Sequence, residues 1–134
     1  MKILRELTIM TPNQPGKLAQ ILRALAKAKI NLQTLNSTSG YDLNLVRLIT
    51  SDFAKTKSLL TKLGYPVTEA TVLAVTILDN PGQLAKITGA FGKAKINVDY
   101  IYATAAVSGS EALVIIHVSD LPAGEQVLRA KGWL

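Results

Sequence analysis

The chain has 134 residues, of which 49% are hydrophobic and 18% are charged, and it contains no cysteine. The lack of cysteine excludes a disulfide framework, a thiolate metal site and a cysteine nucleophile. No apolar run approaches the ~18 residues of a membrane-spanning helix, and no cleavable signal sequence is visible, so we expect a cytoplasmic protein.

The net charge of +6 is unevenly distributed along the chain. Residues 1–66 carry 10 Lys/Arg and 3 Asp/Glu, a balance of +7, whereas residues 67–134 carry 5 and 6, a balance of −1. The basic half could attract nucleic acid or small anions. The simpler interpretation, which we favour, is a solvated lysine face on polar helix surfaces.

The first half of the chain predicts the element order βαββα. Residues 3–10 alternate as a strand, and the turn at residues 11–16 ends it. A helix follows with an inward stripe at Leu18, Ile21, Leu22 and Leu25. Strands are expected at 30–37 and 43–51. A second helix then starts after Asp52 as N-cap, with Gly64 as its C-cap and Tyr65 as the following hydrophobic contact. Its predicted inward stripe is Phe53, Thr56, Leu60 and Leu63.

The second half repeats the first at an offset of 66 residues. Residues 13–19, Asn-Gln-Pro-Gly-Lys-Leu-Ala, return as Asp-Asn-Pro-Gly-Gln-Leu-Ala at 79–85, and Lys-Ala-Lys-Ile-Asn at 27–31 returns unchanged at 93–97. Two copies of one small domain are therefore expected, at 1–70 and 71–134. The second copy predicts a strand at 71–78, a helix at 81–94, strands at 96–105 and 111–119, and a helix at 121–131.

The junction between the copies has no linker composition. Residues 67–77 contain neither Gly nor Ser, so the last strand of the first copy is expected to run almost directly into the first strand of the second. The chain ends at Leu134, which leaves the second copy no room for a fourth strand. One sheet edge is therefore expected to be unfinished.

The repeated turn before the first helix of each copy has two interpretations. Asn or Asp can cap the free N–H groups of the helix, Pro tolerates its first turn, and Gly lets the backbone approach a neighbour closely. The same helix N-terminus also attracts carboxylates and phosphates. We place capping ahead of anion binding, because such caps are common wherever helices begin.

At these residues the sequence resembles the ACT domain, a small ferredoxin-like βαββαβ module that binds amino acids and regulates metabolic enzymes. The resemblance rests on Asn-Gln-Pro-Gly-Lys-Leu-Ala and Lys-Ile-Asn-Leu, and both features return in the second copy in closely similar form, as Asp-Asn-Pro-Gly-Gln-Leu-Ala and Lys-Ile-Asn-Val. It implies an α+β fold with two repeats side by side, the second lacking its last strand. We expect four helices on one face of an antiparallel sheet of about seven strands.

The resemblance also implies ligand sites between the two repeats, built from a strand-to-helix loop of one copy and an Asn of the other. One site would join Asn13, Gln14 and Gly16 with Asn97, and the second would join Asp79, Asn80 and Gly82 with Asn31. Because Asp79 would repel a ligand carboxylate, the first site is preferred. For Asn31 and Asn97, a turn role that satisfies local backbone is an equal alternative.

One departure from the family pattern concerns the helix exit. Where the family usually has Gly before the Ile-Asn pair, this chain has Lys29 and Lys95. Either the helix exit differs, or each Lys accepts an unfavourable backbone conformation.

The expected function is that of a non-catalytic sensor of an amino acid or similar small molecule. The alternative is a ferredoxin-like nucleic-acid-binding protein, which is disfavoured because the central strands offer no exposed aromatic residues for base stacking. We expect no catalytic residue set, no metal and no cofactor, since His117 is the only histidine and the carboxylates do not form a paired set. Tyr100 and Tyr102 share a strand face beside Asn97 and are expected to pack in the core.

A homodimer is expected through the sheet face of the second copy. If Leu73, Val75 and Ile77 point to the helices, strand alternation sends their neighbours to the opposite face. The residues expected there are Val72, Ala74, Thr76, Ile101, Ala103 and Ile115. This apolar surface beside an unfinished edge would be covered by a second chain.

Overall fold

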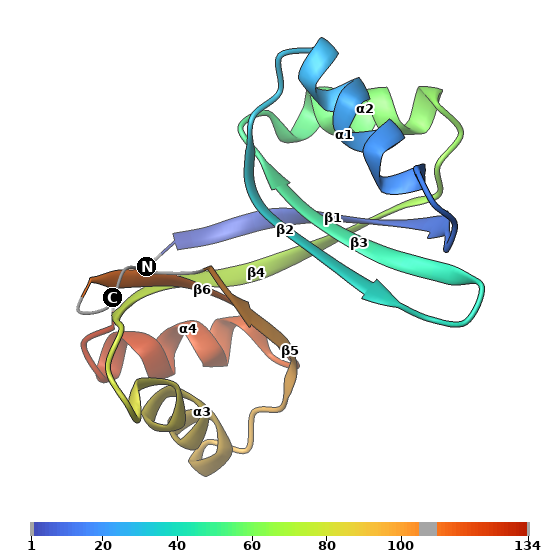
Figure 1. Ribbon diagram of the computed structural model, residues 1–134. Helices are drawn as coiled ribbons and strands as arrows, with labels where there is room; N and C mark the ends of the chain where they lie inside the picture. Colours follow the sequence, from blue (N-terminus) through green and yellow to red (C-terminus); the bar gives the residue numbers. More distant parts are fainter. Residues whose placement is uncertain (1, 105–109, 134) are drawn as a thin grey trace. The chain divides into compact units, whose positions relative to one another are not determined.

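The computed structural model describes residues 2–104 and 110–133 of the chain. These residues form six strands and four helices (Figure 1). In chain order they are β1 (Lys2–Pro12), α1 (Lys17–Lys27), β2 (Leu32–Ser39), β3 (Leu43–Thr50), α2 (Phe53–Lys62), β4 (Val67–Leu78), α3 (Gln83–Lys93), β5 (Val98–Ala103), β6 (Glu111–Val118) and α4 (Leu121–Ala130). The predicted α+β class and the repeated βαββα order are confirmed. Residue 105, the predicted end of a strand, lies outside the described residues.

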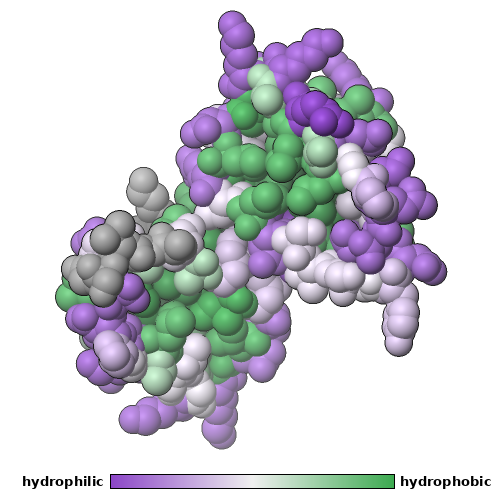
Figure 2. Space-filling view, viewed as in Figure 1, coloured by the Kyte–Doolittle hydropathy of each residue, from purple (hydrophilic) through white to green (hydrophobic). Residues whose placement is uncertain are grey.

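The chain divides into two compact units. The first-copy unit is Arg5–Ala70, and the second-copy unit combines Met1–Leu4 with Thr71–Leu134. Within each unit, apolar side chains gather together and hydrophilic ones surround them (Figure 2). Among the described residues, no helix has the length and apolar character that crossing a membrane requires.

In the first-copy unit, both helices pack on the same face of the sheet. The strand order is β2-β3-β1, with the first residues of β4 next to β1. Ile9 of β1 is the register partner of Val46 of β3. Both lie in one core with Ile21 and Leu25 of α1 and with Leu60 of α2. The predicted stripe of α1 is confirmed, whereas Leu63 at the end of α2 is exposed and does not join the core.

The second-copy unit repeats this arrangement. Its strand order is β4-β6-β5, and α3 and α4 lie on one face of these strands (Figure 1). Val75 of β4 is the register partner of Val114 of β6. Their core includes Ile87 and Phe91 of α3 and Leu128 of α4. The expected inward direction of Leu73, Val75 and Ile77 is confirmed, because all three belong to this core.

The strand count is six in the described residues rather than about seven, because β4 is continuous. Its 12 residues, Val67–Leu78, serve as the last strand of the first copy and the first strand of the second. No Gly, Ser or Pro interrupts this stretch, and the β-branched residues Val67, Thr68, Thr71 and Val72 favour an extended backbone. Two predicted strands that abut without a breaker therefore become one.

The edge expected to be unfinished is bordered by the start of β1. Strands β1 and β4 are neighbours, and Met1–Leu4 cluster with the second-copy unit. Lys2–Leu4 thus lie beside β4, where a ferredoxin-like repeat would place its fourth strand. The expectation of an open edge is wrong, because residues far away in the sequence fill that place.

The apolar sheet face proposed for a homodimer is not free. Val72, Ala74 and Ile115 are only 0%, 3% and 0% exposed within the single chain. Moreover, Ile101 and Ala103 lie on the helix face, because they pair with Ile116 and Val114. A register shift between Val98 and Tyr100 accompanies this placement. The homodimer itself stays a prediction, but this face does not offer the exposed patch it was based on.

The helix exits resolve the question raised by Lys29 and Lys95. Both adopt left-handed backbone, with φ of 57° and 58°. The following residues donate back into the helix, Ile30 N–H to Leu25 O at 3.0 Å and Ile96 N–H to Phe91 O at 2.9 Å. Gly64 has a φ of 87° and opens the same kind of exit after α2, as predicted. Each Lys therefore accepts a conformation that glycine adopts more readily.

Candidate functional site

The loops that precede α1 and α3 leave the helix N-termini without a side-chain cap. Gly16 and Gly82 are the N-cap residues, with φ of 84° and 86° in the left-handed region, and no side chain accepts a hydrogen bond from either first turn in the described structure. By contrast, Asp52 and Asp120 cap α2 and α4 through their carboxylates. The preferred interpretation of the Asn13 and Asp79 loops as capping devices is therefore wrong.

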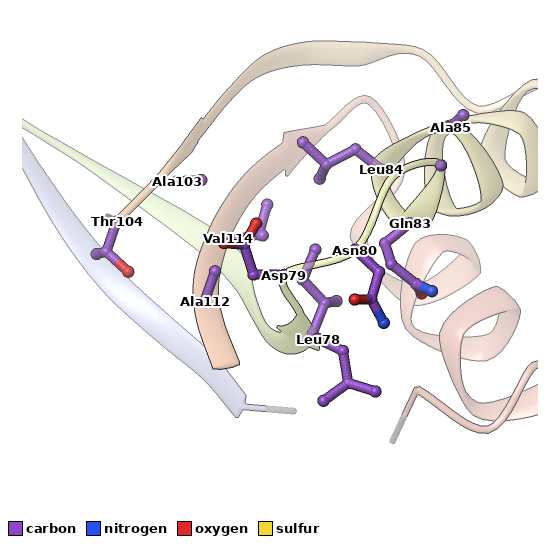
Figure 3. A pocket seen from close by; sticks show the side chains of 12 residues that line it. Leu78, Asp79, Asn80, Gln83, Leu84, Ala85, Ala103, Thr104, Ala112 and Val114 are labelled. Atoms are coloured by element: carbon purple, nitrogen blue, oxygen red, sulfur yellow. The ribbon is translucent and has the colours of Figure 1, made fainter. Parts of the chain in front are cut away.

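The loop of the second copy borders a cavity of about 390 Å³. Figure 3 shows its loop and helix side chains facing residues of the strands. The cavity is lined by Ile77, Leu78, Asp79, Asn80, Gly82, Gln83, Leu84, Ala85, Ala103, Thr104, Ala112 and Val114. All of these residues belong to the second-copy unit. The predicted residues Asp79, Asn80 and Gly82 are thus brought together at one cavity.

Besides the polar side chains of Asn80, Gln83 and Thr104, the cavity has two charged features and an apolar floor. Asp79 contributes a carboxylate, and α3 begins at the cavity with no acidic residue in its first turn. A helix N-terminus carries a partial positive charge from its free N–H groups. Ile77 and Val114 supply apolar surface from the strands. Opposite charges therefore lie beside a hydrophobic surface, within the size range of small-ligand pockets.

The matching loop of the first copy is tied to the β2–β3 hairpin. The Asn13 N–H donates to Asp42 O at 2.8 Å, and Asn13 Nδ2 donates to Ser39 Oγ at 3.2 Å and to Tyr41 O at 3.4 Å. The side chain of Asn13 therefore holds its own loop against the hairpin. Gln14 contributes its carbonyl to the turn, which accepts from the Lys17 N–H at 3.3 Å.

Two polar atoms below this first-copy loop are buried without a hydrogen-bond partner among the described residues. They are Thr11 Oγ1 and Asn44 Oδ1. Thr11 and Asn44 are register partners on β1 and β3, and the second copy has Ile77 and Ala112 as the corresponding pair. The two copies therefore differ in chemistry below otherwise similar loops.

Asn31 and Asn97 occupy equivalent positions before β2 and β5. The Asn31 N–H donates to Ser51 Oγ at 3.1 Å, and the Asn97 N–H donates to Ser119 Oγ at 3.0 Å. Their carbonyls accept from the backbone N–H of the same serines, both at 2.9 Å. These contacts support the turn role that satisfies local backbone. They leave a ligand role of the two side chains untested.

The side chain of Asn97 belongs to a polar cluster on β5 and β6. Asn97 Nδ2 donates to Asp99 Oδ1 at 2.9 Å, and His117 Nδ1 lies 2.8 Å from Asp99 Oδ2. The bond from Asn97, followed by that from His117, lowers the pKa of the Asp99 carboxyl below its ordinary value. The ring of Tyr100 stacks on His117 at 5.0 Å between centroids. Tyr100 and Tyr102 are half-buried rather than core residues.

Each loop lies at the opposite end of its own unit from the Asn that follows it in sequence. The Asp79 N–H donates to Ser110 O just before β6, whereas Asn97 pairs with Ser119 just after β6. The 8 residues of β6 separate the two. Within one unit, the loop and the Asn therefore do not line the same site. Both predicted ligand sites stay predictions. One joins Asn13, Gln14 and Gly16 with Asn97, and the other joins Asp79, Asn80 and Gly82 with Asn31.

Sequence reasoning missed the strand residues that open the cavity. Ala103 and Ala112 line it, while the repeat aligns them with the larger polar residues Ser37 and Asn44. Small residues at these two strand positions, in one copy only, were the signal that could have located the cavity. A comparison of side-chain size between the two copies, rather than of residue identity, would have revealed this difference.

Comparison with known proteins supports the repeat as a family feature. A sequence profile described as an ACT domain pair matches residues 1–130. No curated protein gives a significant match. Among solved structures, the chain is similar to protein BT0572 from Bacteroides thetaiotaomicron, with 28% identity, a TM-score of 0.90, and coverage of 97% of this chain and 89% of that one.

Two further solved structures share the fold at lower identity. The ligand-free regulatory subunit of aspartate kinase from Thermus thermophilus has 19% identity and a TM-score of 0.69 over 98% of this chain and 96% of that one. The corresponding subunit from Thermus flavus has 22% identity and a TM-score of 0.65 over 97% and 94%. With the profile match over nearly its whole length, the chain belongs to the family of ACT domain pairs.

Proposed function

We propose that this ACT domain pair is a non-catalytic regulatory protein, and that it binds a small amino acid with an apolar side chain in the cavity of the second copy. The observation that carries the proposal is the cavity of about 390 Å³ beside Asp79 and the start of α3. Membership of the ACT family supports an amino-acid ligand. The fold shared with regulatory subunits of aspartate kinase is compatible with a regulatory role.

The two charged groups of an amino acid have complementary partners at this cavity. The N-terminus of α3 suits the carboxylate, because no side chain caps it, no acidic residue lies in its first turn, and the Gln83 N–H makes only a long bond of 3.4 Å to Asn80 O. The carboxylate of Asp79 suits the ammonium group. From the sequence, the other site is preferred because Asp79 would repel a ligand carboxylate. This repulsion is avoided when the ammonium group of the ligand faces Asp79.

The apolar floor supports selection among amino acids. Ile77, Ala112 and Val114 offer no side-chain hydrogen bond, so burying a polar ligand side chain against them would leave it unsatisfied. An aliphatic side chain gains from the same burial. A ligand such as valine, leucine or isoleucine thus fits the cavity better than aspartate or lysine.

A thermal-shift and calorimetric screen of the twenty amino acids tests this proposal. A ligand that binds the folded state must raise the melting temperature. We expect aliphatic amino acids to do so and Asp79→Asn to weaken them by about 1.5–3 kcal/mol through loss of a charged hydrogen-bond partner. Asp42→Asn, which removes a carboxylate from the exposed β2–β3 turn, is the matched control and should leave affinity unchanged.

A second variant separates binding at this cavity from binding elsewhere. Ala103 is an exposed residue of β5 at the cavity, so Ala103→Ile should fill the space while preserving strand propensity. Loss of binding with an unchanged melting temperature of the free protein is the expected result. Undiminished affinity in both Asp79→Asn and Ala103→Ile would disprove the site. Asn31→Ala then tests whether the first copy contributes.

A further inference from the structure

A second hollow of the second-copy unit lies along α3 and the end of α4. Its volume is about 420 Å³, and it shares Ala85 with the cavity beside Asp79 but differs from that cavity in its charged and aromatic residues. Lys86 and Lys93 of α3 and Lys131 after α4 line it, together with Gly89 and Trp133. We call this hollow the lysine–tryptophan groove. It combines three ammonium groups with one aromatic wall.

The positive charge in the lysine–tryptophan groove is not a general property of this half of the chain. Residues 67–134 contain 5 Lys/Arg and 6 Asp/Glu, yet three of these five basic residues line the groove and none of the six acidic residues does. Among the described residues, Lys86, Lys93 and Lys131 take part in no ion pair. Gathered like charges repel one another, so a bound anion would be favoured here.

The aromatic wall is held in place by the exit of α4. Gly132 adopts a φ of 76°, and the Trp133 N–H donates to Leu128 O at 3.0 Å. The ring packs partly on the core of the unit and also lines the groove. A fixed indole ring gives a planar ligand a surface on which to stack.

Gly89 leaves open space on the α3 side of the groove. A Cβ placed at Gly89 would meet no atom within 4 Å, so the space above the helix is empty. The repeat aligns Gly89 with Arg23, Lys86 with Gln20 and Lys131 with Leu63. The first copy therefore has neither the open floor nor the three lysines.

We propose that the lysine–tryptophan groove binds a nucleotide, with the base against Trp133 and the phosphates among Lys86, Lys93 and Lys131. The volume lies in the range of about 300–1,000 Å³ that small-ligand pockets occupy. A single aromatic wall suits one base, whereas proteins that hold single-stranded nucleic acid stack successive bases on several aromatic residues. The site gives the ACT pair a second ligand class beside the proposed amino acid.

Trp133 is the only tryptophan of the chain, so its fluorescence reports on this groove directly. We expect ADP to quench it saturably, after correction for absorption with N-acetyltryptophanamide. Adenosine and inorganic phosphate should each bind more weakly than ADP, because each supplies only half of the contacts. Absence of saturable quenching at millimolar ADP would overturn the proposal.

Variants assign any quenching to the groove. Lys86→Gln and Lys131→Gln should each weaken ADP binding about tenfold, as expected for a lost contact to a charged group. Gly89→Leu, which fills the open space with a neutral side chain, should abolish it, and the first-copy change Lys27→Gln should have no effect. Unchanged ADP affinity in Gly89→Leu with an unchanged melting temperature would contradict the proposed position.

Two comparisons separate this proposal from its alternatives. Tighter binding of an oligodeoxyadenylate than of ADP, with a steep dependence on salt, would replace the nucleotide with nucleic acid. Asp79→Asn and Ala103→Ile should leave ADP binding intact. Loss of amino-acid binding in those variants therefore tests the proposed function independently of the groove.

Discussion

At the scale of single residues, Lys29 and Lys95 hold conformational strain at equivalent helix exits. A left-handed L-residue costs about 1–2 kcal/mol, and part of this is offset because glycine loses more backbone entropy on folding. We expect Lys95→Gly to raise the free energy of unfolding by about 0.5–1 kcal/mol, measured by urea denaturation. Arg23→Gly, at an exposed position in the middle of α1, is the control and should lower it by a similar amount.

Thr11 and Asn44 are expected to weaken the first-copy unit. An unsatisfied buried polar group costs about 1–3 kcal/mol, and replacing both members of such a pair by apolar residues removes that cost. Thr11→Ile combined with Asn44→Ala, which copies the second unit, should therefore raise the melting temperature. The reverse exchange, Ile77→Thr with Ala112→Asn, should lower it. An unchanged melting temperature in the first variant would show that water satisfies the two atoms.

The pKa of Asp99 provides a test of how Asn97 acts. Because Asn97 and then His117 hold this pKa below its ordinary value, the interaction stabilises the fold above the ordinary pKa of aspartate. That stabilisation is lost as the pH falls through the lower folded pKa. Asn97→Ala should raise the pKa of Asp99 toward its ordinary value, as followed by NMR titration. A pKa unmoved by the change would remove the local role assigned to Asn97.

The residues of the candidate site were only partly predictable from the sequence. Asp79, Asn80 and Gly82 followed from the repeated motif, because turn residues between a strand and a helix have a local signature. Ala103 and Ala112 did not, because a cavity depends on how large neighbouring side chains are in space. The buried atoms Thr11 Oγ1 and Asn44 Oδ1, which have no hydrogen-bond partner among the described residues, were likewise not predicted. They face each other because of the strand register, which no short motif encodes.

At the scale of elements, the four helices fall into two kinds. Asp52 and Asp120 accept hydrogen bonds from the Lys55 and Ala123 N–H groups at 3.0 and 3.1 Å, whereas α1 and α3 begin at glycine. Asp52→Ala and Asp120→Ala should each lower the free energy of unfolding by about 1 kcal/mol. Asp79→Ala should leave it nearly unchanged, by denaturation in the absence of ligand. A loss in Asp79→Ala as large as in Asp120→Ala would restore the capping role.

Element order was predictable because periodicity reports which face of a helix or strand is buried. The βαββα pattern, the Asp52 cap and the Gly64 exit all follow from such local signals. Periodicity could not predict whether Val67–Leu78 forms one strand or two. A single extended segment and two abutting strands have the same composition, and only pairing with β1 and β6 distinguishes them.

At the scale of the whole molecule, the second-copy unit depends on the first residues of the chain. Deleting residues 2–4 removes the segment beside β4 and exposes backbone groups at that edge. We expect the unfolding midpoint reported by Trp133 fluorescence to fall. Replacing the same residues by threonine keeps the strand backbone and should have a smaller effect. Equal midpoints for the deletion and the native protein would show that this segment does not support the unit.

The presence of Met1–Leu4 in the second-copy unit has a consequence for anyone who wishes to move one copy into another protein. A gene fragment that begins at residue 71 encodes the repeated motif but omits the segment beside β4, and a fragment that ends at residue 70 carries Lys2–Leu4 without their neighbours. A transplantable second copy therefore has to be assembled from two separate stretches of coding sequence, with a new connection between them. The stretch of sequence that is repeated is therefore not the same as the set of residues that forms one compact unit.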